Sequence, residues 1–222
     1  MNLPFFLRDQ YNEIKEIYPG LYPPINISDF WVISGLLDFT AKYQGISIKD
    51  KYQIEILIPI TNPLHIPFAR EIGGRIPMDF HHSTEGLCLG EPGRVIQKFN
   101  EEPTLLGFIN NCLIPYLYNF SYKEKFGYLI FGELSHGTTG LLEYYQELFG
   151  IKDRKRILQL LGLCINSHLN GQIRCPCGSK KKLRKCHGIL LNGLISGVPR
   201  EIIKAEYDLI NNGNKSHKFS PR

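Results

Sequence analysis

Long apolar runs are missing from this chain of 222 residues. No stretch approaches the roughly 20 apolar residues that a helix needs to cross a bilayer, so we expect no membrane segment. The amino terminus also lacks the basic head and the cleavage site of a secretory signal. We therefore expect a cytoplasmic protein. In that compartment the six cysteines are predicted to be metal ligands or reactive thiols and not disulfides.

Acidic residues are missing from residues 174–185, and this gap accounts for the charge of the chain. The segment carries six cations: Arg174, Lys180, Lys181, Lys182, Arg184 and Lys185. Because the formal net charge is +5, the rest of the chain is nearly neutral. The basic character is therefore a local patch. It has no interleaved aromatic ladder, so an acidic protein surface is the expected partner and nucleic acid is not.

No internal repeat is visible, and the pattern of apolar residues changes once along the chain. Helical spacing over residues 3–17 is followed by strand patterns at 31–39, 52–60 and 68–76. Helical patterns then cover 103–117, 138–149, 154–165 and 199–210. Short turns between the strands favour an antiparallel meander. The sequence predicts an α+β fold made of an opening helix, a meander and later helices.

Cys88 lies between two leucines, just after Gly86 and a few residues after His81 and His82. A thiol is a nucleophile only when its thiolate is accessible and favoured over the protonated form, which titrates near ~8.5 in free cysteine. The alternative is that Cys88 is a small buried apolar residue, as lone cysteines often are. The chemistry of the side chain alone leaves both interpretations open.

The order of elements and the segment around Cys88 together resemble the ubiquitin-conjugating enzymes. His81-His82-Ser83 stands where that family has a His-Pro-Asn triplet, and Gly86-Leu87-Cys88-Leu89-Gly90 resembles its cysteine motif. The chain is similar in particular to bacterial members encoded in antiphage (CBASS-type) operons, and the run Gly132–Gly140 is similar to a recurring signature of that group. The likeness covers roughly residues 1–150. It implies a ubiquitin-conjugating-like catalytic domain over 1–152.

This resemblance implies acyl transfer in bacterial antiphage defence. The thiolate of Cys88 would accept the carboxy-terminal acyl group of a protein from an activating enzyme, and an amine or another nucleophile would then take it. The implied substrate is the carboxy terminus of a cyclic-nucleotide synthase or a ubiquitin-like protein. His82 and His136 are candidate general bases, and Glu133 is a candidate catalytic residue of the same run as His136. The alternative for that run is a tight turn with a helix cap.

The triplet departs from the family pattern, because Ser83 replaces its asparagine and His82 its proline. Losing one hydrogen-bond donor to an oxyanion costs on the order of 10²–10³ in rate, so another group must donate or the site is slow. For His81 we favour a structural role beneath the active loop. Two other functions stay open: a non-catalytic adaptor with a degenerate conjugating fold, and a cysteine hydrolase that uses Cys88 and His136.

The most specific pattern lies near the carboxy terminus, where Cys175, Cys177, Cys186 and His187 supply three sulfurs and one imidazole. This is a closed tetrahedral set suited to structural zinc, with no open position for catalysis. The spacing closely resembles the zinc-binding SEC-C module. We therefore expect residues 153–222 to form a helical linker, a zinc module at about 173–190 and a last helix. Cys164 and His168 have no completing spacing and are expected to be structural, and Cys112 is expected in the core.

Overall fold

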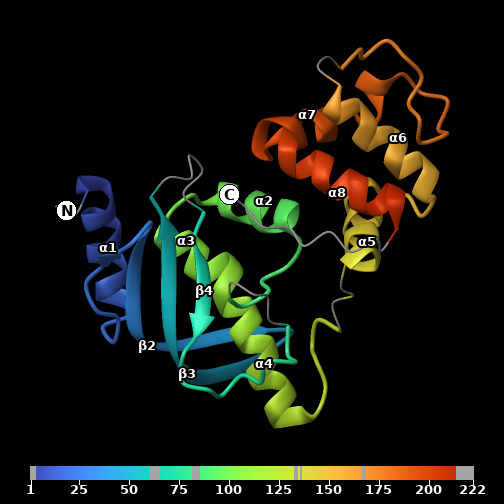
Figure 1. The fold of residues 1–222 in the computed structure, drawn as a ribbon. Coiled ribbons are helices and arrows are strands. Elements are labelled where there is room, and N and C mark those ends of the chain that lie inside the picture. The colour runs from blue at the N-terminus through green and yellow to red at the C-terminus, as the bar shows by residue number, and fades with distance from the viewer. Residues whose placement is uncertain are drawn as a thin grey trace. The chain divides into compact units, whose positions relative to one another are not determined.

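The computed structural model describes residues 4–60, 66–81, 86–132, 135, 137–166 and 169–213 (Figure 1). The chain divides into two compact units, which are described separately below. The first contains Met1–Gly90 and Lys98–Glu133, and the second contains Glu91–Gln97 and Leu134–Arg222. Residues 134–152, which the sequence analysis assigned to the catalytic domain, thus group with the carboxy-terminal part of the chain.

The first unit opens with helix α1 (Phe5–Ile17), which is followed by a four-stranded antiparallel sheet. The strands are β1 (Ile25–Ile27), β2 (Phe30–Tyr43), β3 (Ile46–Pro59) and β4 (Phe68–Glu71). They pair in chain order, so each strand is bonded to the next one along the sequence. The predicted α+β class and the antiparallel meander are confirmed.

Two features of the chain set the register and the end of this meander. Gln44 and Gly45 both have positive φ, which allows the two-residue turn that pairs Tyr43 with Ile46. The last strand is shorter than the predicted 68–76, because the Glu71 carboxylate accepts the amides of Gly73, Arg75 and Ile76 and closes a turn there. The predicted apolar face of β3 is confirmed, with every second side chain from Tyr52 to Ile58 buried.

A long helical segment covers the sheet in three parts: α3 (Leu105–Phe108), the π-helical turn η1 (Ile109–Leu113) and α4 (Ile114–Phe126). It begins where the sequence predicts, because the Thr104 hydroxyl caps it by accepting the Gly107 amide. Helix α4 packs on β2 and β3, and the hydroxyls of Tyr52 and Ser121 meet there at 2.6 Å. The core of this unit lies between that helix and the sheet (Figure 1).

The second unit is helical, and two of its helices pack on the last one. It contains α5 (Gly137–Phe149), α6 (Arg154–Ile165), the 3₁₀ turn η2 (Leu183–Lys185), α7 (Gly188–Gly197) and α8 (Arg200–Asn212). Both α5 and α6 contact α8, and α6 also contacts α7. None of the helices in the described part of the chain is both long and apolar enough to span a membrane.

A buried carboxylate joins three elements of this second unit. Glu206 of α8 is only 2% exposed. It accepts the Gly93 amide at 2.8 Å, at the beginning of α2 (Pro92–Glu101), and the hydroxyl of Tyr145 on α5. Burial, the largest influence, raises the pKa of the Glu206 carboxyl, and the charge of Glu91 raises it further against the lowering effect of both hydrogen bonds.

Candidate functional site

Cys88 is held by main-chain hydrogen bonds on both sides of its segment. The Leu87 amide donates to the Ala69 carbonyl of β4 at 2.8 Å, and the Cys88 amide donates to the His81 carbonyl at 2.7 Å. Leu87 is buried, whereas Cys88 itself is half-buried. The side chain is thus not sealed in the core, as the alternative to a reactive thiol would require.

Gly86 explains how the segment reaches the sheet so closely. A Cβ atom at this position would lie 2.3 Å from the Ala69 carbonyl oxygen, far inside any real contact distance. Only glycine therefore lets the chain run beside β4 and bring Leu87 into bonding range of the same oxygen. The glycine before Cys88 is thus a requirement of the backbone path.

Tyr116 of α4 supports the other side of this segment. Its hydroxyl donates to the Phe80 carbonyl at 3.0 Å and to the His81 carbonyl at 3.3 Å. Burial is the main cause that raises the pKa of the Tyr116 hydroxyl, and a negative charge on Cys88 raises it further. The sequence analysis did not single out Tyr116, because a tyrosine on the apolar face of a helix looks like an ordinary core residue.

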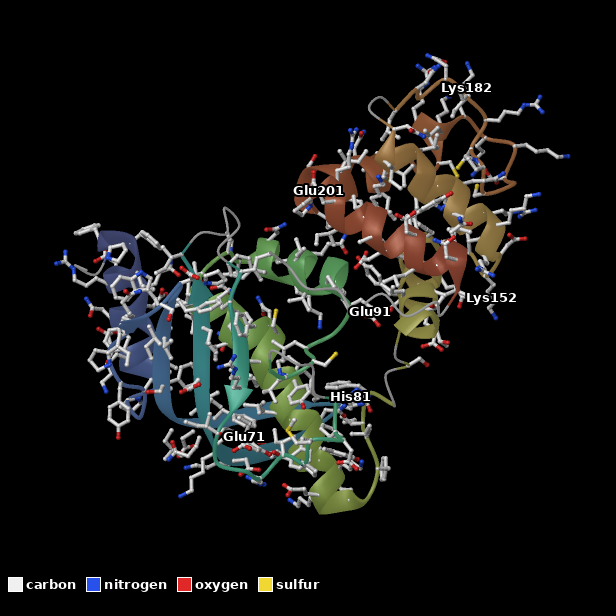
Figure 2. The ribbon with its side chains drawn as sticks, in the orientation of Figure 1. Glu71, His81, Glu91, Lys152, Lys182 and Glu201 are labelled. Carbon is white, nitrogen blue, oxygen red and sulfur yellow. The ribbon has the colours of Figure 1, made fainter. Side chains whose placement is uncertain are left out.

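The predicted catalytic residues are only partly within the described structure. His81 (labelled in Figure 2) contributes its main-chain carbonyl to the position of Cys88, while the role predicted for its side chain stays a prediction. His82, Ser83, Glu133 and His136 lie outside the described residues. The structure therefore places Cys88 and His81 side by side through one hydrogen bond and does not address the other four assignments.

The two cysteines predicted to be structural are chemically unlike Cys88. Cys112 and Cys164 are both buried. Burial raises the pKa of the Cys112 thiol to about 11 and that of the Cys164 thiol to about 12. Both thiols therefore stay protonated and unreactive near neutral pH. The expectation that Cys112 belongs to the core is confirmed, and Cys164, which was expected to be structural, is buried as well.

The four predicted metal ligands come together in the second unit. One ligand atom each from Cys175, Cys177, Cys186 and His187 lies within 4.8 Å of all the others, so the cluster can hold a metal ion. The Nδ1 atom of His187 lies 3.3 Å from Cys175 Sγ and 3.2 Å from Cys186 Sγ, and Cys177 Sγ lies 3.5 Å from Cys186 Sγ. Sulfurs at 2.3 Å from a tetrahedral zinc would be about 3.7 Å apart. The donor set and its spacing fit such an ion.

The surroundings of the cluster orient its ligands. The Nε2 atom of His187 lies 2.9 Å from the Phe149 carbonyl at the end of α5, so Nε2 carries the proton and Nδ1 is free to bind the metal. Burial opposes ionisation of the Cys177 thiol, but hydrogen bonds to its sulfur, led by those of Ser179, outweigh it and lower its pKa to about 6. Thiolate is the form that binds a metal.

Arg156 of α6 supports the loop that carries the first two cysteines. Its Nη1 atom donates to the Cys177 carbonyl at 2.9 Å. Gly178 follows with a positive φ of 86°, and a Cβ there would lie 2.6 Å from the same guanidinium nitrogen. The turn between the two halves of the cluster is therefore fitted against α6. Lys182, on the same loop, is exposed (Figure 2).

Comparison with known proteins adds no family to these observations. No protein-family model, no curated protein and no solved structure matches the chain. What the two candidate sites do is therefore inferred from their own residues.

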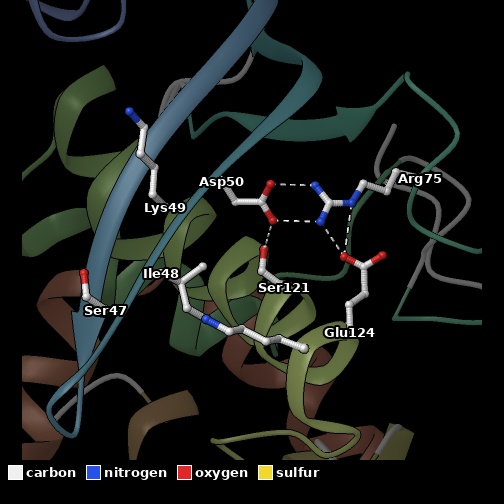
Figure 3. A pocket seen from close by; sticks show the side chains of 8 residues that line it. Ser47, Ile48, Lys49, Asp50, Arg75, Ser121 and Glu124 are labelled. Carbon is white, nitrogen blue, oxygen red and sulfur yellow. Dashed lines mark hydrogen bonds and ion pairs between the residues drawn. The ribbon is translucent and has the colours of Figure 1, made fainter.

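A pocket of about 420 Å³ in the first unit was not predicted from the sequence (Figure 3). It lies between β3 and α4, and Arg75 forms ion pairs there with Asp50 and Glu124 while its guanidinium stacks 4.5 Å over the Tyr52 ring. Although burial raises the pKa of Asp50, bonds from Arg75 and Ser121 outweigh it and keep that pKa low. Because both carboxylates bond to the Arg75 guanidinium, the network ties β3 to α4 and suits a structural role.

Proposed function

We propose that the first unit is a ubiquitin-conjugating-like domain that carries a protein's carboxy-terminal acyl group as a thioester on Cys88. The observation that carries the proposal is the position of this thiol. Of the six described cysteines, three belong to the metal cluster and two are buried, which leaves Cys88 as the half-buried thiol outside the cluster. It follows an antiparallel meander and precedes the long helical segment, in the order that the resemblance implies.

The proposed chemistry needs only a positioned thiolate and an activated acyl donor. The Cys88 sulfur attacks the carbonyl carbon of a thioester on an activating enzyme, and the enzyme's own thiolate leaves. An acceptor amine then attacks the new thioester, the carbon–sulfur bond breaks, and the amine passes its proton to a base while Cys88 leaves as a thiolate. His82 is the proposed base. Fixing the Cys88 segment at Ala69 and His81 supports the positioning that such transfer requires.

The metal cluster is proposed to be a structural zinc site. Zinc held by three thiolates and one imidazole has no open position, so its contribution is to fold the loop it binds. That loop belongs to an acid-free stretch, residues 154–200, with ten lysine and arginine side chains. Such a surface favours an acidic protein partner. We propose that this partner is part of the substrate complex, in which a cyclic-nucleotide synthase supplies the acyl group.

Adduct formation in the native host tests the first proposal. Wild-type protein should carry a partner that survives denaturation and is released by a thiol reductant, and Cys88→Ala should carry none. Cys88→Ser should instead hold an ester that resists the reductant but is cleaved by alkali. Cys112→Ala is the matched control, because this thiol is buried and protonated. An adduct that persists in Cys88→Ala would exclude this thiol as the attachment point.

The adaptor alternative gives a different result in the same experiment. An adaptor would recover a partner without any covalent bond, and it would recover it equally well in wild type and Cys88→Ala. A cysteine hydrolase would show a transient acyl-enzyme that water releases without an acceptor. Adding a primary amine distinguishes the proposed conjugating enzyme from the hydrolase, because transfer to the amine yields an amide product whereas hydrolysis yields a free acid.

A further inference from the structure

We propose that Tyr116 is the positioning residue of Cys88, a role that rests on the proposed function of that thiol. No contact between the Tyr116 hydroxyl and the sulfur is needed. The hydroxyl acts on the main chain that holds Cys88, because the Cys88 amide and the Tyr116 hydroxyl donate to the same acceptor, the His81 carbonyl. The distances to that oxygen are 2.7 Å from the amide nitrogen and 3.3 Å from the hydroxyl.

The hydroxyl spans two consecutive carbonyls and not one. It lies 3.0 Å from the Phe80 oxygen as well, so its single hydrogen is shared between neighbouring acceptors. These two oxygens belong to the turn that comes before Cys88 in the chain. Without the hydroxyl, the Phe80 carbonyl would lose this donor and the His81 carbonyl would keep the Cys88 amide. Their negative ends would then be less compensated near the sulfur, which disfavours a thiolate.

Tyr116 is well suited to hold this turn because its own position is fixed. The residue is 8% exposed and belongs to α4, which packs on the sheet. Its ring meets that of Phe80 at 5.8 Å between centroids, and Phe80 meets Phe120, one turn further along α4, at 4.8 Å. The ammonium of Lys123, which also belongs to α4, lies 4.9 Å from the centroid of the same Phe80 ring. The turn is therefore clamped to α4 by packing and by the hydroxyl together.

Electrostatics agree with this arrangement. After burial, the charge of Cys88 is the largest influence that raises the pKa of the Tyr116 hydroxyl, so the two groups are close enough to interact. The hydroxyl consequently remains neutral when the thiol ionises. It can keep donating to the two carbonyls throughout the reaction and adds no competing negative charge.

The test compares Tyr116→Phe with Tyr118→Phe in the zinc-loaded full chain. Tyr118 is the matched control, because it lies on the same helix and donates to a different main-chain oxygen, that of Ile46, at 2.9 Å. The readout is the rate at which iodoacetamide alkylates Cys88 as a function of pH, measured on the peptide by mass spectrometry. The buried thiols Cys112 and Cys164 report any unfolding in the same sample.

We expect both variants to melt within a few degrees of each other, and only Tyr116→Phe to change the reactivity of Cys88. Its alkylation at neutral pH should slow by about threefold, with the midpoint of the pH profile about half a unit higher. An unchanged profile would overturn the proposal, and so would a melting temperature that collapses in Tyr116→Phe alone, since that shows a purely structural role. Failure of the conjugating function would appear separately, as a wild type that forms no adduct while the alkylation contrast persists.

Discussion

The loss in the free energy of unfolding on replacing Glu206 should depend on whether the new side chain can still accept a hydrogen bond. Glu206→Ala removes the acceptor of the Gly93 amide and of the Tyr145 hydroxyl, both inside the second unit. A buried donor without a partner costs about 1–3 kcal/mol. Two such donors give a loss of about 2–6 kcal/mol in the free energy of unfolding, before any cavity is counted. That is a large part of the about 5–15 kcal/mol typical of a domain.

Glu206→Gln should be tolerated better than Glu206→Ala, because its amide oxygen still accepts from Gly93 and its amide nitrogen can donate to the Tyr145 oxygen, so only the Tyr145 hydroxyl hydrogen loses its acceptor. It also removes the ionisable group. The folded-state pKa of Glu206 is raised above the unfolded value. The stabilisation from that shift is therefore fully present below the unfolded pKa of about 4.3 and is lost as pH rises through the folded pKa. Glu91, with Arg94 as its ion-pair partner, is the other ionised group facing this carboxyl. Relative to wild type, the glutamine variant should therefore gain stability as pH rises.

Urea unfolding of the zinc-loaded chain, followed by far-ultraviolet circular dichroism between about pH 5 and about pH 8, measures this difference. Trp31 is the single tryptophan and belongs to the first unit, so its fluorescence reports whether that unit is unaffected. Equal losses in Glu206→Gln and Glu206→Ala would refute the hydrogen-bond argument. Parallel pH curves for wild type and the glutamine variant would refute the assignment of the titration to Glu206.

Two further predictions concern the metal cluster and the glycine before Cys88. One zinc ion should be found per chain. Removing it with a chelator, or replacing a ligand in Cys186→Ser, should unfold the loop around it and lower the helical circular-dichroism signal of the second unit. A metal-free chain with unchanged stability and protease resistance would contradict a structural role. Gly86→Ala should destabilise the first unit by about 1–3 kcal/mol, the usual cost of forcing an extra carbon into a closely packed site, because its Cβ would lie 2.3 Å from the Ala69 oxygen. Gly162→Ala on α6 is its control, since no atom lies within 4 Å of the added Cβ; equal thermal shifts in the two variants would count against the close approach at Gly86.

The sequence predicted the parts of the fold that depend on local patterns. Alternating apolar residues identified β3, and a proline followed by helical spacing identified α8. Helix α2 was missed although Pro92 stands at its first turn and Val95, Ile96 and Phe99 share one face. Half of its ten residues are polar or charged, and its three large apolar residues stand out only when they are read at helical spacing. Helix α7 was missed because its three glycines are typical of loops and turns.

The candidate sites likewise contain residues that a local pattern predicts and supporting residues that it does not. The four metal ligands lie within thirteen consecutive residues, so their spacing was enough to predict the cluster. The supports of both sites come from distant parts of the chain. Tyr116 lies 36 residues from Phe80, and Arg156 lies 21 residues from Cys177. Only the packing of helices brings these pairs together, and no local pattern encodes that packing.

The π-helical turn η1 determines which side chains α4 turns toward the Cys88 segment. Such a turn accommodates one residue more than an α-helical turn, and each residue of a helix advances its direction by about 100°. Everything beyond Leu113 is therefore rotated by roughly a quarter of a circle relative to an uninterrupted helix. Asn110, within η1, accepts the hydroxyl of Tyr18 at 2.8 Å, so the offset is anchored to the end of the opening helix. A segment of the same length without the π-turn would keep its helix and its tyrosines but turn them by that angle, whereas loss of one residue within η1 would restore a regular helix and leave them facing the Cys88 segment.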